Sequence, residues 1–260
     1  VHDATVMAVE GYLKTSVSGL APGYWYHYAF FDGAAPSWSR RSKIGRFRTA
    51  FADECDAPLT VAGTHGTNFR FMPYKALQVT AREEPDVFIQ LGDMSYNDGS
   101  ETTEDFRAKW HETLEDPGYA ELLPSVGQYI TWDDHEVTDN SELYTLPDNI
   151  LRNGIDAFFE TLPVPRFEDG KAWTSYRWGR SVEFFVLDCR FERDIDSRNT
   201  EDPIYISKEQ MAWLKDGISQ SQAHFKVIVN SVPIIDFPPL WVFESDRWEG
   251  YMAQRDELLD

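Results

Sequence analysis

Residues 128–136 read Gln-Tyr-Ile-Thr-Trp-Asp-Asp-His-Glu, so an apolar, strand-like run passes directly into four consecutive ionisable residues. Like charges crowded at the edge of a sheet repel one another unless a cation or hydrogen bonds compensate them. A bound metal therefore explains residues 133–136 better than a solvated loop does. Asp134 is a candidate ligand with a hard oxygen, whereas His135 is suited to stay off the metal as a general acid or electrostatic clamp.

A second cluster follows another apolar strand candidate, Val87–Leu91, which runs into Gly92-Asp93-Met94-Ser95-Tyr96. Gly92 frees the backbone to turn, and Asp93 then emerges beyond the carboxyl end of the strand, where open α/β sheets bind their ligands. A carboxylate at this position can bridge two cations, and Tyr96 can add a phenolate oxygen. Taken alone, the motif fits equally well with Asp93 as a helix N-cap and Tyr96 as a packing ring.

From residue 58 onward, apolar strands alternate with amphipathic segments, which is typical of an α/β fold with a sheet covered on both faces. The strand candidates are Leu59–Gly63, Val87–Leu91, Tyr129–Trp132, Val182–Leu187 and Phe225–Val232. The clearest helix candidate is Ser207–Ser219, because Ser207 can cap its N-terminus and apolar side chains recur on one face. We therefore expect one α/β domain over residues 58–260.

Residues 1–52 have a different pattern, in which short β-rich runs such as Tyr24–Phe31 and Gly45–Ala50 are separated by turns. The segment Leu20–Tyr26 is similar to the turn-and-strand signature of fibronectin type III and immunoglobulin-like modules. Such a module needs about 100 residues. We therefore expect a partial N-terminal β-sandwich domain whose other half lies upstream of Val1.

The composition narrows the possible partners. The chain has 44 acidic and 24 basic residues and a net charge of −20, which argues against binding a nucleic-acid backbone over a broad surface. The acidity serves either solubility or the attraction of cations. The sequence contains no apolar run of the ~20 residues that a membrane span requires and no signal-peptide pattern at its start. Its two cysteines, Cys55 and Cys189, indicate no disulfide framework.

Together the two ionisable clusters resemble motifs of the PhoD-like alkaline phosphatase/phosphodiesterase family of metallophosphatases. Thr131–Val137 looks like the hallmark of that family, and Gly92–Tyr96 is similar to its Gly-Asp-x-x-Tyr element. Further similar segments are Phe185–Arg190, Glu209–Leu214, Phe225–Pro233 and Trp248–Tyr251, the last leading to Arg255-Asp256. The resemblance covers nearly all of residues 58–260 and implies a metallophosphatase-like domain with layers of sheet and helix.

The resemblance also implies Ca²⁺ and Fe³⁺ cofactors, hydrolysis of small phosphomonoesters and phosphodiesters, and an extracellular or periplasmic location. Two cations roughly 3.5–4 Å apart would clamp the phosphoryl oxygens and generate a metal-bound hydroxide for in-line attack. Asp93 would bridge the cations, whereas Tyr96 and Asp134 would each hold one. His135 would assist the leaving group. Arg190 has two alternative roles, steadying the phosphate or pairing with a carboxylate at the strand end.

One departure from the family pattern lies at the end of the first strand. The family commonly has Ser-Cys there, and this chain has Thr64-His65. His65 is a candidate ligand for iron or zinc, and a supporting or purely structural histidine is an equal alternative. Asp133 and Asn140 are additional candidate ligands that could complete the site.

A second departure is that the Gly-Asp-x-His metal element of the family does not occur after Tyr251. We therefore expect the missing ligands to lie beyond Asp260, and weak metal binding and little activity in this chain by itself. The rival interpretation is a non-catalytic family member that binds metal or phosphate. A Ser-His-Asp hydrolase is disfavoured because the sequence contains no Gly-x-Ser-x-Gly element.

Overall fold

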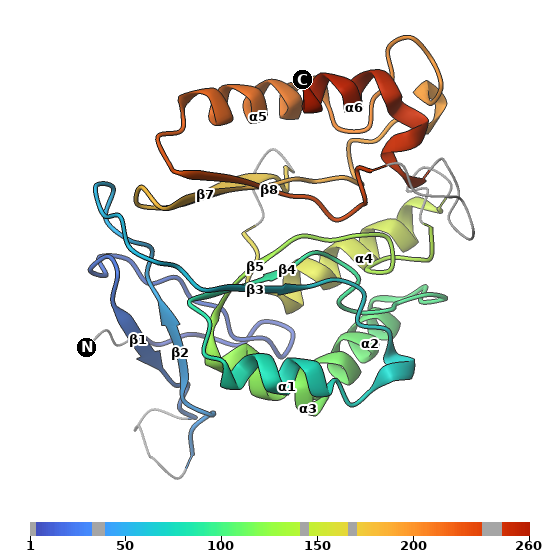
Figure 1. The fold of residues 1–260 in the computed structure, drawn as a ribbon. Coiled ribbons are helices and arrows are strands. Elements are labelled where there is room, and N and C mark those ends of the chain that lie inside the picture. The colour runs from blue at the N-terminus through green and yellow to red at the C-terminus, as the bar shows by residue number, and fades with distance from the viewer. Residues whose placement is uncertain (1–3, 33–39, 141–145, 166–170, 236–245) are drawn as a thin grey trace.

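The computed structural model describes residues 4–32, 40–140, 146–165, 171–235 and 246–260. Two three-stranded sheets face each other, and helices cover their outer faces (Figure 1). The first sheet is parallel throughout and consists of β3 (Val61–Thr64), β4 (Val87–Gln90) and β5 (Gly127–Ile130). In the second sheet, β7 (Val182–Val186) pairs antiparallel with β6 (Thr174–Trp178) and parallel with β8 (Phe225–Val229).

The helices form two groups, one outside each sheet (Figure 1). Those on the side of the first sheet are α1 (Lys75–Arg82), α2 (Thr103–Glu115), α3 (Pro117–Leu122) and α4 (Asp148–Thr161). Those on the side of the second sheet are α5 (Lys208–Gln220) and α6 (Met252–Leu259). Short 3-10 turns are η1 (Phe69–Phe71), η2 (Leu123–Ser125), η3 (Ile195–Ser197) and η5 (Trp248–Tyr251). As expected, Ser207 caps α5, because its side chain accepts the backbone N–H of Gln210.

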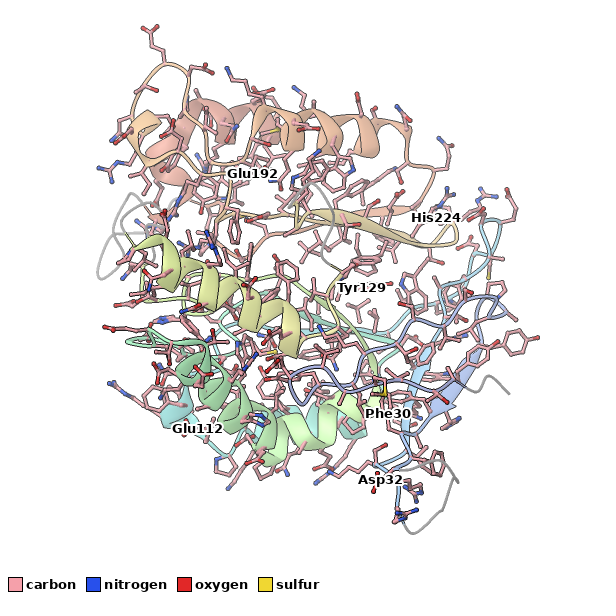
Figure 2. The ribbon with its side chains drawn as sticks, turned by 180° about the vertical axis from the view of Figure 1, so that it is seen from behind. Phe30, Asp32, Glu112, Tyr129, Glu192 and His224 are labelled. Carbon is pink, nitrogen blue, oxygen red and sulfur yellow. The ribbon has the colours of Figure 1, made fainter. Side chains whose placement is uncertain are left out.

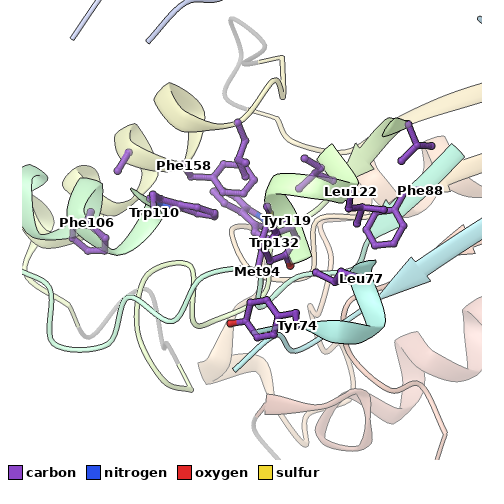
Figure 3. Packing of buried hydrophobic residues seen from close by; sticks show 14 of the residues in the cluster. Tyr74, Leu77, Phe88, Met94, Phe106, Trp110, Tyr119, Leu122, Trp132 and Phe158 are labelled. Atoms are coloured by element: carbon purple, nitrogen blue, oxygen red, sulfur yellow. The ribbon is translucent and has the colours of Figure 1, made fainter. Parts of the chain in front are cut away.

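The strands alternate between two cores. Val87 and Ile89 of β4 pack between the sheets, whereas Phe88 packs against the helices below (Figure 3). In β7, Phe184 faces the inter-sheet core and Phe185 packs with α5. Both faces of the strands are covered, as predicted, but there are two sheets instead of one, so helices cover the outer face of each sheet and the other sheet covers its inner face. A strand with two apolar faces has the same sequence pattern in both arrangements.

Side chains also connect the two sheets directly. Tyr129 of β5 lies between the two sheets (Figure 2). Its ring stacks on Tyr176 in β6 at a centroid distance of 3.8 Å, and its hydroxyl accepts the indole N–H of Trp178. Trp178 in turn contacts Phe51 edge to face at 5.2 Å. The carboxyl ends of β5 and β7 are joined by the Thr131 hydroxyl, which donates to Leu187 O at 2.8 Å.

Four predicted strands end earlier in the structure, and one of them, Val87–Leu91, ends at Gln90. The prediction Tyr129–Trp132 is wrong at its end, since β5 stops at Ile130. The backbone N–H of Asp133 donates to the Glu136 carboxylate instead of to a neighbouring strand, which turns the chain away from the sheet. The predicted Phe225–Val232 likewise ends at Val229, and Val182–Leu187 ends one residue early, at Val186.

The described part of residues 1–52 contains one antiparallel strand pair, β1 (Trp25–Tyr28) with β2 (Gly45–Arg48). The β-sandwich domain stays a prediction. Cys55 and Cys189 are both free, as expected. Among the described residues, no helix combines the length and the apolar character that crossing a bilayer requires.

A groove of about 640 Å³ runs between β3 and β8. Apolar side chains line most of it, including Leu59, Val61 and Phe225. Within the described part of the chain, β3 pairs only with β4, and β8 pairs only with β7, so both strands have one unpaired edge.

Candidate metal centre and active site

The loops after β4 and β5 meet at one edge of the first sheet, because the two strands are parallel neighbours. Gly92 has a φ of 108°, and a Cβ there would lie 2.7 Å from the backbone nitrogen of Asp133, so only glycine fits. Asp93 follows with a φ of 52°, a left-handed conformation uncommon for this residue type. The tight approach of the two loops brings their acidic side chains together.

Two groups of candidate metal ligands share Asp93. One contains Asp93, Asp134 and His135, the other His65, Asp93 and Asp133, and within each group the ligand atoms lie within 4.8 Å of one another. The predicted convergence of Asp93 and Asp134 at one sheet edge is therefore confirmed. His65, at the end of β3, lies with Nε2 2.9 Å from Asp133 Oδ2 and 3.9 Å from Asp93 Oδ2.

The electrostatics of these carboxylates fit a cation. Burial, together with the charges of Asp133, Glu136 and Asp134, raises the pKa of Asp93 to about 8. Burial also raises the pKa of Asp134, although Arg190 opposes the shift. Each shift means that the ionised form lacks sufficient positive charge nearby. Carboxylate oxygens and imidazole nitrogens are both metal ligands, so this cluster could hold metal ions.

Glu136 holds the two loops together. Its fully buried carboxylate accepts the backbone N–H groups of Asp93 at 3.1 Å, Met94 at 2.6 Å and Asp133 at 2.8 Å. Burial raises the pKa of Glu136 to about 7, although these three hydrogen bonds act in the opposite direction. Sequence reasoning identified the four-residue cluster but assigned no role to Glu136, because its partners are backbone atoms that no side-chain pattern reveals.

His135 is held between an aspartate and an aromatic ring. Its Nδ1 lies 2.8 Å from Asp98 Oδ1, and its ring packs against Tyr96 at a centroid distance of 4.0 Å and an interplanar angle of 32°. Burial alone would lower the pKa of His135, but the hydrogen bond with Asp98 and the charges of Asp134 and Asp93 raise it to about 9. Sequence reasoning missed Asp98, although it lies two residues after the Gly-Asp-x-x-Tyr motif.

The hydroxyl of Tyr96 lies 3.4 Å from Asp93 Oδ2, so this predicted ligand reaches the cluster. Burial and the Asp93 charge raise the pKa of Tyr96 above its ordinary value. A phenolate at this position therefore requires a nearby cation. Asn140 contacts the cluster through its backbone N–H, which donates to Asp134, while its side-chain amide donates to Asp139 at 2.9 Å. A side-chain ligand role for Asn140 stays a prediction.

Arg190 is buried and forms ion pairs with Asp133, Asp134 and Asp246. Burial opposes its charge, but these carboxylates outweigh burial and keep the pKa of Arg190 above its ordinary value. Two roles were predicted for Arg190, steadying the phosphate or pairing with a carboxylate at the end of the strand. The structure shows the ion pairs with carboxylates. Asp246 was missed because it lies 56 residues away in sequence and belongs to no recognised motif.

Comparison with known proteins agrees with this arrangement. Residues 60–260 match the model of the PhoD-like phosphatase family. The chain is 24% identical over 300 residues to alkaline phosphatase D of Bacillus subtilis (strain 168), across 95% of this chain and 50% of that protein. The chain thus spans about half the length of this curated relative.

Solved structures show the same fold at lower sequence identity. A structure of PhoD superimposes with a TM-score of 0.79 and 22% identity, covering 93% of this chain and 54% of that one. The purple acid phosphatase PPD1 from yellow lupin (Lupinus luteus) seeds gives a TM-score of 0.51 and 16% identity, covering 80% and 36% of the two chains. The fold is thus metallophosphatase-like, and by the match over residues 60–260 this chain belongs to the PhoD-like phosphatase family.

Proposed function

We propose that this chain carries the active site of a metal-dependent hydrolase of phosphomonoesters, phosphodiesters or both. The observation that carries the proposal is the pair of ligand groups that share Asp93 at the carboxyl edge of β4 and β5. One shared carboxylate between two ligand sets is the arrangement that a two-metal phosphoesterase needs. Family membership supports the same chemistry.

Two ion positions follow from the side chains. Asp93 and Asp134 would hold one ion together with the Tyr96 oxygen, whereas His65, Asp93 and Asp133 would hold the other. Cations bound there would polarise the phosphoryl oxygens and acidify the attacking water. Ca²⁺ and Fe³⁺ are our candidates by resemblance to the PhoD-like family, with other divalent metals as alternatives, and the carboxylate, phenol and imidazole groups of the two sets are compatible ligands.

His135 would serve the leaving group. Because Asp98 binds its Nδ1, the Nε2 atom, which lies 3.7 Å from Asp139 Oδ1, would be the one to donate a proton to the departing oxygen. Arg190 acts on the protein itself, since its guanidinium binds Asp133 and Asp246 and compensates part of the negative charge beneath the ions. Small phosphate esters remain the proposed substrates, and an extracellular or periplasmic location stays a prediction.

The test combines metal analysis with turnover. The purified chain is stripped with chelator, reloaded with calcium and iron, and assayed with p-nitrophenyl phosphate and bis(p-nitrophenyl) phosphate. As the sequence predicts, turnover by this chain alone should be low, but it should depend on metal, and Asp93→Asn should lower it further without unfolding the chain. Metal binding without turnover in wild type would favour the non-catalytic alternative. Absence of both would refute the proposal.

A further inference from the structure

The turn η1 is fixed against the loop that carries Asp93. The backbone N–H of Gly66 donates to Gly92 O at 3.2 Å, and that of Thr67 donates to Asp93 O at 2.9 Å. The Thr67 hydroxyl also donates to Met94 O at 3.0 Å. Residues that follow Thr67 are therefore held in a defined position beside the candidate metal centre.

Phe69, the first residue of η1, extends the aromatic contact that begins at His135. Its ring meets Tyr96 edge to face at 6.4 Å, and the Tyr96 ring packs at a tilt of 32° against His135 at 4.0 Å. The ammonium of Lys109 lies 5.6 Å from the centre of the Phe69 ring. Phe69 nevertheless leaves 44% of its surface exposed. We call Phe69, Tyr96 and Lys109 the aromatic platform.

A single exposed phenylalanine is ordinary on a protein surface and needs no explanation. Phe225 on the edge of β8 is such a residue, 71% exposed and distant from the acidic cluster. Phe69 differs because two aromatic contacts connect it to His135 and a cation lies over its ring. In a chain with a net charge of −20, a cation beside an aromatic ring is suited to a ligand that is both planar and anionic.

We propose that the aromatic platform binds the planar aryl group of the departing alcohol, so that aryl phosphate esters are preferred substrates. The inference rests on the proposed function. Water would add to phosphorus while the P–O bond to the aryl oxygen breaks, and the aryl alcohol would leave with a proton. Because His135 serves that oxygen and Tyr96 lies against His135, the aryl ring would extend from the scissile bond toward Phe69. Lys109, whose ammonium lies 5.6 Å from the centre of the Phe69 ring, would lie at the end of the aryl group remote from the phosphoryl oxygens.

The test compares aryl and alkyl phosphate esters whose leaving alcohols have matched pKa values, using the metal-loaded chain. We expect wild type to prefer the aryl ester in kcat/KM, and Phe69→Ala to reduce the aryl-to-alkyl ratio by about tenfold, the loss that a buried ring contact produces. Phe69→Leu keeps apolar bulk without the π-face and should reduce the ratio to a similar extent. If Phe69→Ala fails to fold, Phe69→Leu still tests the proposal.

Phe71→Ala is the matched control, because Phe71 belongs to the same turn and is 77% exposed. Two residues along a 3-10 helix correspond to a rotation of about 240°, so its side chain leaves the turn in a different direction. The control should leave the ratio unchanged. An equal fall in both variants, or an unchanged ratio in Phe69→Ala, would overturn the proposal.

Binding of phenylphosphonate and butylphosphonate, measured by calorimetry, separates this proposal from the proposed function. Neither compound can be hydrolysed, so the comparison does not depend on turnover. Tighter binding of phenylphosphonate that is lost in Phe69→Ala would support the platform even in a chain that hydrolyses nothing. Turnover without any difference between aryl and alkyl compounds would leave the proposed function intact and refute the platform.

Discussion

Replacing Glu136 by glutamine tests whether this carboxylate sets the geometry of the metal centre. The Oε2 atom accepts two backbone N–H groups, from Asp93 and Asp133, and Oε1 accepts one, from Met94. In Glu136→Gln, the amide oxygen should take the Oε2 position, because that choice keeps two of the three hydrogen bonds. The amide NH₂ then faces the N–H of Met94, so one charge-assisted bond of about 1.5–3 kcal/mol is lost.

A second effect of the substitution has the opposite sign. Burial raises the pKa of Glu136 from 4.5 to about 7, so the ionised carboxylate destabilises the metal-free fold. Each pKa unit corresponds to about 1.4 kcal/mol, so removing the charge should raise the free energy of unfolding by about 3 kcal/mol above pH 7. The two effects have opposite signs and overlap, because the pKa of about 7 already includes the hydrogen bond from Met94. We expect the free energy of unfolding of the metal-free chain to change by no more than about 2 kcal/mol at pH 8.

Metal affinity should respond differently, because the variant loses a negative charge and one of the bonds that position Asp93. Groups that orient metal ligands typically contribute 10–100-fold in affinity, and we expect about that loss here. The assays are urea denaturation in chelator and calorimetric titration with calcium. Glu136→Ala, which leaves all three N–H groups without an acceptor, should destabilise the fold by several kcal/mol. Wild-type metal affinity in Glu136→Gln would refute the reasoning.

Three further predictions concern neighbouring residues. The pKa of Asp93 is raised from 3.8 to about 8, so the folded chain keeps a proton that the unfolded chain releases between these values, and metal-free stability falls as pH rises through that window. Thermal unfolding of the metal-free chain should be measured in chelator from pH 5 to 8. The decrease in stability with rising pH should be smaller in Asp93→Asn than in wild type. The same pH dependence in both would contradict a raised pKa of Asp93. Arg190→Met leaves buried carboxylates unpaired and should reduce the free energy of unfolding by about 3–5 kcal/mol, against less than about 1 kcal/mol for Arg82→Met at an exposed ion pair. Equal losses of unfolding free energy in the two variants, measured by urea denaturation, would contradict a stabilising role for the buried ion pairs of Arg190. His135→Ala should slow hydrolysis of alkyl esters more than of p-nitrophenyl esters, and equal losses would exclude a leaving-group role.

Local patterns predicted much of the fold and part of the site. The positions of Asp93 and Asp134 followed from strand ends, because parallel neighbours bring their carboxyl ends to one edge. The division into two sheets did not follow, since Phe184 and Phe185 are both buried and the sequence does not show what covers each face. Glu136 was missed because it binds backbone atoms.

The unpaired edges of β3 and β8 have a consequence for the protein at high concentration. A free edge offers backbone groups to any other strand, and charged side chains are the usual protection against such pairing. β8 carries Lys226, whereas β3 consists of Val61-Ala62-Gly63-Thr64 and carries no charge, with Val61 44% exposed. Aggregation should therefore begin at β3, and Val61→Lys is the substitution that should reduce aggregation in concentrated solutions.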